Sequence, residues 1–152
     1  MKNFLSFVSF FLALAVGAVN ADDESDVQAV VDAVIAASNA NDLDKEEQYY
    51  SSEATEFNGW GSELRKLDWD GARDWVRKGG KWKVEHGKID IAMHGTAAIV
   101  TGYAKGKFSP PDKGWMEWLG RYTWVLSKED GAWKIVHRHN SRGIFVPADE
   151  DK

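Results

Sequence analysis

The hydrophobic period of the chain changes once, at Gly79-Gly80, and this change constrains the fold more than any other feature. Before it, apolar residues recur at the three- and four-residue spacing of a helical face, whereas after it they alternate along strand-like runs. Helices and strands that are segregated in this way are typical of α+β folds, in which helices cover one face of a mainly antiparallel sheet. Because the chain has 152 residues, we expect a single such domain.

Three helices are predicted before the change of period. The residues that indicate their starts are Ser25 with Gln28, Asp44 with Glu47, and Asp68. The first helix is followed by a break at residues 39–42, and the short second helix is expected to carry Tyr49 and Tyr50. Gly79-Gly80 is expected to end the third helix.

Two long hairpins are predicted after the change of period. The first joins residues 83–93 to 97–108, and the second joins 115–127 to 132–141 through Asp130-Gly131, a strong hairpin signal. Strict alternation along the last strand separates two sets of side chains. One set is Trp133, Ile135, His137, His139 and Ser141, and the other is Val136, Arg138 and Asn140.

Residues 1–21 have the pattern of a secretory signal peptide, with Lys2, an apolar run and the small-residue site Val19-Asn20-Ala21. A membrane anchor is the alternative, but the run is shorter than the roughly 20 apolar residues that a spanning helix needs. Cleavage after Ala21 is expected to leave a domain of residues 22–152, and cleavage after Ala18 fits the same rule. We therefore expect an exported protein, periplasmic or secreted, with no membrane attachment after cleavage.

Composition and motifs exclude several kinds of function. The net charge is −5 and no basic run is present, so we expect no nucleic-acid partner. The absence of cysteine excludes disulfides, thiolate nucleophiles and cysteine-ligated zinc. No phosphate or dinucleotide loop is present, and we expect no cofactor. His137 and His139 could share a metal only if a third ligand such as His86 or His94 came near, so no metal site is predicted.

The last hairpin resembles a known family. Its quoted stretches are Gly120 to Leu126 and Glu129 to Ser141. They resemble SnoaL-like proteins of the nuclear transport factor two-like, or ketosteroid isomerase-like, superfamily, and also the association domain of calcium/calmodulin-dependent protein kinase II. The resemblance covers about residues 26 to 145 and implies a cone, in which a curved sheet wraps around three helices and encloses a pocket. It also implies a homodimer formed through the sheet.

The resemblance to the kinase domain guides the choice of pocket residues. The pocket arginines of that domain match Lys105, Trp124 and Asn140 here, which places the face with Trp124, Arg138 and Asn140 inward. Only Lys105 is still cationic, which argues against a three-arginine anion site. The residues expected to bind a ligand are Tyr50, Trp60, Tyr103, Lys105, Trp118, Tyr122, Trp124, Arg138 and Asn140.

The resemblance also suggests a catalytic alternative. Ketosteroid isomerase uses a carboxylate base and an oxyanion hole made by Tyr and a protonated Asp. Glu56 lies about where that base is expected, with Glu53 as the fallback, but no acid is found for the oxyanion hole. We therefore expect a protein that binds a small organic molecule in an aromatic pocket. The alternatives are an isomerase- or hydrolase-type enzyme that uses Glu56 as general base, and a dimeric assembly or scaffold module.

Overall fold

The computed structural model describes residues 21–59, 61, 63–141 and 144–147. Its helices are α1 (Ala21–Asn39), α2 (Leu43–Glu47) and α3 (Trp69–Arg77). Its strands are β1 (Tyr50–Phe57), β2 (Arg65–Lys66), β3 (Lys81–His94), β4 (Ala97–Ser109), β5 (Met116–Glu129), β6 (Ala132–Asn140) and β7 (Ile144–Pro147). The predicted signal peptide lies outside the described residues except for Ala21. Among the helices described, none has both the length and the apolar character to cross a bilayer.

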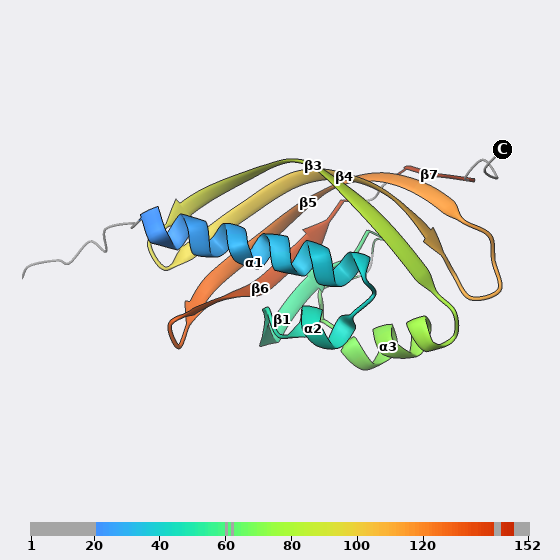
Figure 1. The fold of residues 1–152 in the computed structure, drawn as a ribbon, viewed down its shortest axis with the longest axis horizontal. Helices are drawn as coiled ribbons and strands as arrows, with labels where there is room; N and C mark the ends of the chain where they lie inside the picture. The colour runs from blue at the N-terminus through green and yellow to red at the C-terminus, as the bar shows by residue number, and fades with distance from the viewer. Residues whose placement is uncertain (1–20, 60, 62, 142–143, 148–152) are drawn as a thin grey trace, which may run out of the picture.

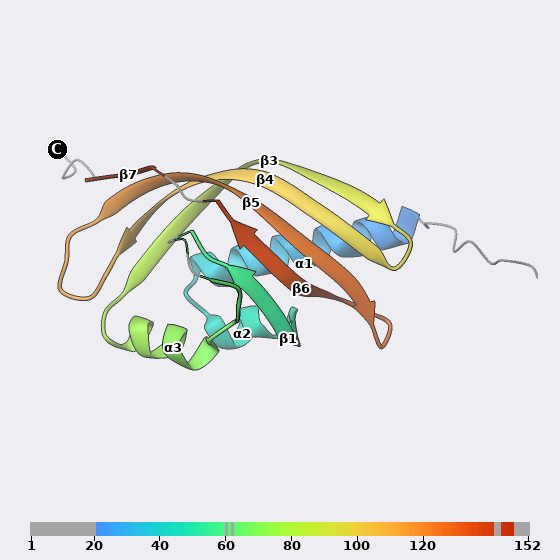
Figure 2. The same ribbon diagram turned by 180° about the vertical axis from the view of Figure 1, so that it is seen from behind.

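The strands form one curved sheet in the order β2-β1-β6-β5-β4-β3, with β7 pairing to β5. Every pair is antiparallel except β1 with β6, which is parallel. All three helices lie on the concave side of the sheet (Figure 1). The view from behind shows β1 and β6 closing the side of the cone next to α2 (Figure 2). The predicted α+β cone is confirmed.

The core lies between α1 and the concave face of the sheet. Val27, Val31 and Val34 are spaced along one face of α1 and are fully buried against the strands. The far end of α1 is attached to the edge strand β3, where the Asn39 side chain exchanges two hydrogen bonds with the backbone of Val84, at 2.7 and 2.9 Å. This attachment fixes the end of α1 over the wide part of the cone.

Glycines on the inner face give aromatic rings room to lie flat on the sheet. A Cβ on Gly102 would lie 2.4 Å from the hydroxyl oxygen of Tyr122, and one on Gly106 would lie 2.8 Å from Nε1 of Trp118. The absence of a side chain at these two positions lets the rings of Tyr122 and Trp118 approach the backbone of β4 closely.

Two predicted helix starts are wrong. Helix α1 is already helical at Ala21, so Ser25 lies inside it and donates a hydrogen bond to the Asp22 carbonyl at 2.8 Å. The acidic first turn, which suits the positive end of a helix, explains the earlier start. In α2 the cap is Asp42 rather than Asp44, and the chain leaves the helix before Tyr50, which begins β1.

The predicted alternation along the last strand is also wrong, because β6 contains a bulge. Ile135 pairs with Leu126 and His137 pairs with Val125, so Val136 is an extra residue without a partner. The bulge reverses the alternation, as bulges do. As a result Trp133 and Ile135 share the inner face with Arg138, while His137 lies on the outer face.

Candidate functional site

A cavity of about 720 Å³ lies between the helices and the concave face of the sheet. Its walls come from α1, α2, α3 and the inner faces of β1 and β3 to β6. The rings that line it are Tyr50, Trp69, Trp75, Trp82, Phe108, Trp118, Tyr122 and Trp124. The stacked rings of Trp75 and Trp82, whose centroids are 5.2 Å apart, join α3 to β3 at the wide end of the cone.

One row of cross-strand neighbours brings charged groups to the cavity wall. Arg65 of β2 is paired with Glu56 of β1, Glu56 with Arg138 of β6, and Arg138 with Trp124 of β5. This register places the Glu56 carboxylate between two guanidinium groups. Oε1 accepts hydrogen bonds from Arg65 at 2.7 and 2.9 Å, and Oε2 lies 2.8 and 2.9 Å from two nitrogens of Arg138.

Glu56 is therefore a paired anion. It is only 2% exposed, and burial by itself would raise its pKa. The charges and hydrogen bonds of Arg138 and Arg65 outweigh burial and hold the pKa of Glu56 below its ordinary value. Both carboxylate oxygens are occupied, which leaves Glu56 poorly placed to accept a proton from a ligand.

A second carboxyl, Glu46 of α2, reaches the same cavity. It is 4% exposed, and its Oε1 lies 3.8 Å from Nη1 of Arg138. Burial raises the pKa of Glu46, and the charge of Arg138 with hydrogen bonds from Ser38 and Tyr50 offsets this only in part. Sequence analysis did not identify Glu46, because an acidic residue in a short polar helix has the pattern of a solvated face.

His86 of β3 lies on the opposite wall. Its ring contacts those of Tyr122 and Trp124 edge-on, with centroids 5.2 and 6.2 Å away, and burial lowers its pKa. Burial also raises the pKa of Tyr122 to about 12. These groups are therefore neutral at physiological pH, and they give this wall an uncharged, aromatic character.

The structure brings most of the predicted site residues together. Those that line the cavity are Tyr50, Glu56, Trp118, Tyr122, Trp124, Arg138 and Asn140. Trp60 lies outside the described residues. Glu53, the fallback base, is on the surface in an ion pair with Lys66.

Tyr103 and Lys105 were predicted as ligand-binding residues, and the structure places them elsewhere. Tyr103 pairs with Arg121 and Lys105 with Leu119 on the outer face of β4 and β5, whereas the alternating Gly102 and Ala104 face inward. Tyr103 is 66% exposed, and Lys105 forms an ion pair with Glu85. Carrying over the kinase-domain position to Lys105 therefore selected the wrong face of the strand.

The two histidines of β6, His137 and His139, pack against side chains of the neighbouring strand β1. His137 Nδ1 lies 2.9 Å from the Thr55 hydroxyl oxygen, and the rings of His137 and His139 both contact Phe57 edge-on. Across the part of the chain that the structure describes, no three potential ligands from His, Asp or Glu gather as a metal site would require.

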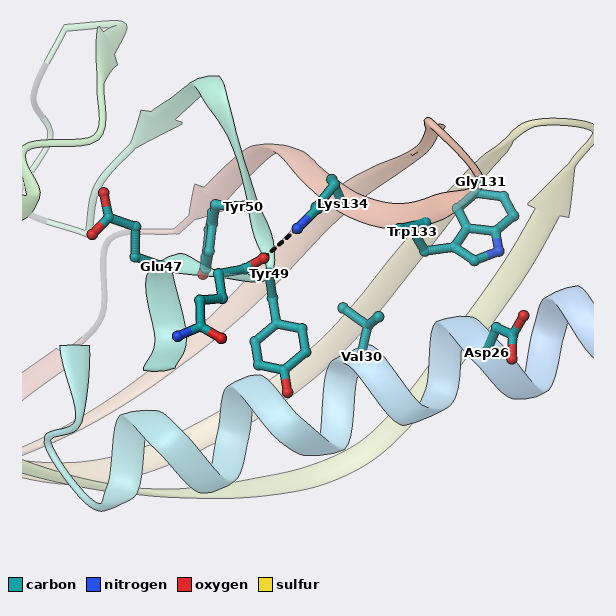
Figure 3. A pocket seen from close by; sticks show the side chains of 10 residues that line it. Asp26, Val30, Glu47, Tyr49, Tyr50, Gly131, Trp133 and Lys134 are labelled. Carbon is teal, nitrogen blue, oxygen red and sulfur yellow. Dashed lines mark hydrogen bonds between the residues drawn. The ribbon is translucent and has the colours of Figure 1, made fainter. Parts of the chain in front are cut away.

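A second hollow lies between α1, the junction of α2 with β1, and the start of β6 (Figure 3). In it the ring of Tyr49 lies beside Val30 of α1, and Lys134 donates a hydrogen bond to the Gln48 carbonyl. Tyr50 is the one residue predicted to bind a ligand that also borders this hollow. Apart from Tyr103, Lys105 and Glu53, the described residues of the predicted site line the cavity inside the cone.

Comparisons with known proteins agree with the geometry. The family model for the SnoaL-like domain matches residues 27–147. An NTF2-like protein from Cytophaga hutchinsonii superposes with a TM-score of 0.65 at 16% identity, covering 82% of this chain and 99% of the other. The association domain of Caenorhabditis elegans calcium/calmodulin-dependent protein kinase II gives 0.61 at 18% identity, covering 79% and 95%.

A third similar structure is an enzyme. A type 2 hexachlorocyclohexane dehydrochlorinase superposes with a TM-score of 0.67 at 12% identity, covering 84% of this chain and 90% of the other. No curated protein sequence matches the chain. An assembly domain and an enzyme thus share this fold, so function has to be argued from the site.

Proposed function

The chain belongs to the SnoaL-like domain family, and we propose that it binds a small organic molecule in the cavity inside the cone. The observation that carries the proposal is the cavity itself, about 720 Å³ in volume. Pockets for small molecules typically measure about 300–1,000 Å³ and combine apolar walls with a few placed polar groups.

The chemistry of the walls supports a flat or amphipathic ligand. Trp118, Tyr122 and Trp124 line the cavity from the inner face of β5, and Arg138, beside Trp124 on β6, adds a polar group together with Glu46 of α2. Aromatic faces bind planar apolar groups, and the polar cluster would orient the molecule.

Catalysis with Glu56 as general base is the second candidate, and its ion pairs argue against it. A base must be free to accept a proton, and a pKa near the working pH makes it efficient. Glu56 has both oxygens bound and a pKa that Arg138 and Arg65 hold low. If Glu56 were the base, Glu56→Gln would abolish turnover and leave ligand binding largely intact.

The binding proposal is tested by removing part of the aromatic wall. Trp124→Ala is expected to weaken binding of a planar aromatic probe, 2-naphthol, by about 1–3 kcal/mol through lost apolar contact. Trp115→Ala is the matched control, because Trp115 is 43% exposed and does not line the cavity. Isothermal titration measures both. Equal binding by the two variants would contradict the proposal.

Export is proposed as well. The small-residue site that ends at Ala21 supports cleavage there, and the mature chain would then begin at Asp22, in the first turn of α1. N-terminal sequencing of protein from the periplasm or medium tests this. Retention of residues 1–21 in a membrane fraction would favour the anchor.

A further inference from the structure

Arg138 presents one nitrogen to the cavity without a close partner. Glu56 binds Nε and Nη2, at 2.9 and 2.8 Å. The contacts of Nη1 are longer: 3.5 Å to the Tyr50 hydroxyl and 3.8 Å to the Glu46 carboxylate. Good hydrogen bonds from N–H to oxygen are about 2.7–3.2 Å, so the hydrogen bond from Nη1 to Tyr50 is long and a closer oxygen could replace or join it.

The position of this nitrogen makes it available to a ligand. The Arg138 side chain keeps 26% of its surface exposed, and Arg138 lines the cavity beside Trp124. A guanidinium is charged at any physiological pH and binds carboxylates strongly. An oxygen of a bound molecule is therefore the natural partner of Nη1.

Glu46 decides whether a negatively charged oxygen is tolerated there. When Glu46 is ionised, the cluster of Arg65, Arg138, Glu56 and Glu46 has no net charge. When Glu46 carries a proton, the same cluster has a net charge of +1 and can accept a monoanion. Because Glu46 is buried and has no ion-pair partner closer than 3.8 Å, its ionised form is costly, and binding of an anion beside it favours the proton further.

The groups packed around Glu46 are accounted for. Arg138 faces it from β6, Tyr50 and Glu56 from β1, and Ser38 from α1. Burial raises the pKa of Tyr50 to about 12, so Tyr50 stays neutral. The other titratable groups on the cavity wall are common to the wild type and to any Glu46 variant. They are Arg65, Asp68, His86, Arg121 and Tyr122.

We propose that the cavity takes an aromatic carboxylic acid, whose carboxylate binds Nη1 of Arg138 while Glu46 holds one proton. The inference rests on the proposed function and adds the chemical class of the ligand. The aromatic walls select the ring, and the single cationic donor matches a monoanion better than a phosphate dianion. Binding is then linked to proton uptake, with no covalent change in the ligand.

The experiment compares two probes of the same shape. 2-Naphthoate carries a carboxylate, which is ionised above about pH 5.5, and 2-naphthamide is neutral. Both are titrated calorimetrically between about pH 5.5 and 8.5, in buffers that differ in ionisation enthalpy, so that proton uptake is measured directly. The wild type is expected to take up close to one proton with 2-naphthoate at the upper end of this range. Its affinity for naphthoate is expected to fall by up to about tenfold per pH unit above the pKa of Glu46, with no such change for the amide.

Two variants separate the role of Glu46 from a general effect of charge. Glu46→Gln is expected to abolish proton uptake and to make naphthoate affinity independent of pH. Glu53→Gln removes an exposed carboxylate of the same type, paired with Lys66 outside the cavity, and is expected to behave as the wild type.

The outcomes distinguish the two proposals. If both probes bind equally, or if Glu46→Gln still takes up the proton, the inference is wrong and the binding function stands. If neither probe binds at any pH, the proposed function fails and the inference falls with it. Naphthoate binding with proton uptake that is lost only in Glu46→Gln supports both.

Discussion

Two glutamates of the same cavity lie in opposite electrostatic environments. Glu56 is held between two guanidinium groups, whereas Glu46 is buried with its nearest cation 3.8 Å away. As a result the pKa of Glu56 lies below the ordinary value and that of Glu46 above it. Pairs of carboxyls whose pKa values are separated in this way are common where one group must stay charged and the other must exchange a proton.

Glu56→Gln tests the structural role of the ion pairs. Leaving the partly buried Arg138 without its carboxylate is expected to lower the free energy of unfolding by about 1–3 kcal/mol near neutral pH, mostly through Arg138, because Arg65 is half exposed. Urea denaturation measures the loss, and Glu53→Gln should change stability by less than about 0.5 kcal/mol.

The stability lost in Glu56→Gln is expected to depend on pH. Because the folded pKa of Glu56 is below the unfolded one, its stabilisation is present above the ordinary pKa of 4.5 and is lost as the pH falls through the folded pKa. The difference in the free energy of unfolding between the wild type and Glu56→Gln should therefore become smaller at acidic pH. If this difference stayed constant down to low pH, it would contradict the lowered pKa of Glu56.

Most of the predicted residues that line the cavity come from the strands of the last hairpin, which the sequence also predicts. Tyr122, Trp124, Arg138 and Asn140 were chosen from the last hairpin, and all line the cavity. The pairing of Glu56 with Arg138 could not be predicted, because the polar segment Tyr50–Phe57 gave no clear strand signal and its parallel partner lies more than 80 residues away. Lys105 was chosen by a positional match to the kinase domain, and it lies with Tyr103 on the outer face of β4.

At the scale of elements, bulges and glycines shape the cavity. The bulge at Val136 allows β6 to contribute Trp133 and Ile135 to the core and Arg138 to the cavity from one face. Hairpins, the cap of α3 at Asp68 and the glycine stop after it were predictable because each depends on local chemistry. The bulge was not, because it depends on which side chains the rest of the fold needs to bury.

Gly102→Ala tests the close approach of an aromatic ring to the sheet. The new Cβ would lie 2.4 Å from the Tyr122 hydroxyl oxygen, so the ring must move, at a cost of about 1–3 kcal/mol. Chemical denaturation measures this cost. Gly114→Ala is the control, because nothing lies within 4 Å of the added atom, and a neutral Gly102→Ala would show that the ring does not depend on this glycine.

At the scale of the molecule, the convex face of the sheet carries exposed apolar side chains opposite the helices. Ile99 and Tyr103 of β4 and Leu119 of β5 lie on it, and Leu119 is 59% exposed. Exposed apolar patches of this kind are typical of association surfaces. We expect a homodimer through this face, as the family resemblance implies.

Sedimentation of residues 22–152 tests the dimer. The mature chain is expected to be dimeric at micromolar concentration, and Tyr103→Glu with Leu119→Glu should make it monomeric, because charges would then be buried at the interface. A wild-type monomer would contradict the dimer and leave the fold unaffected.

The interior of the cone is the part of the molecule that we propose binds the ligand. Isotope-filtered nuclear Overhauser measurements between unlabelled 2-naphthoate and uniformly labelled protein test it most directly. We expect contacts from the naphthyl ring to Trp124, Tyr122 and Trp118, which line the cavity. Contacts confined to Tyr103 and Leu119 on the convex face, or to Val30 and Tyr49 in the second hollow, would contradict it.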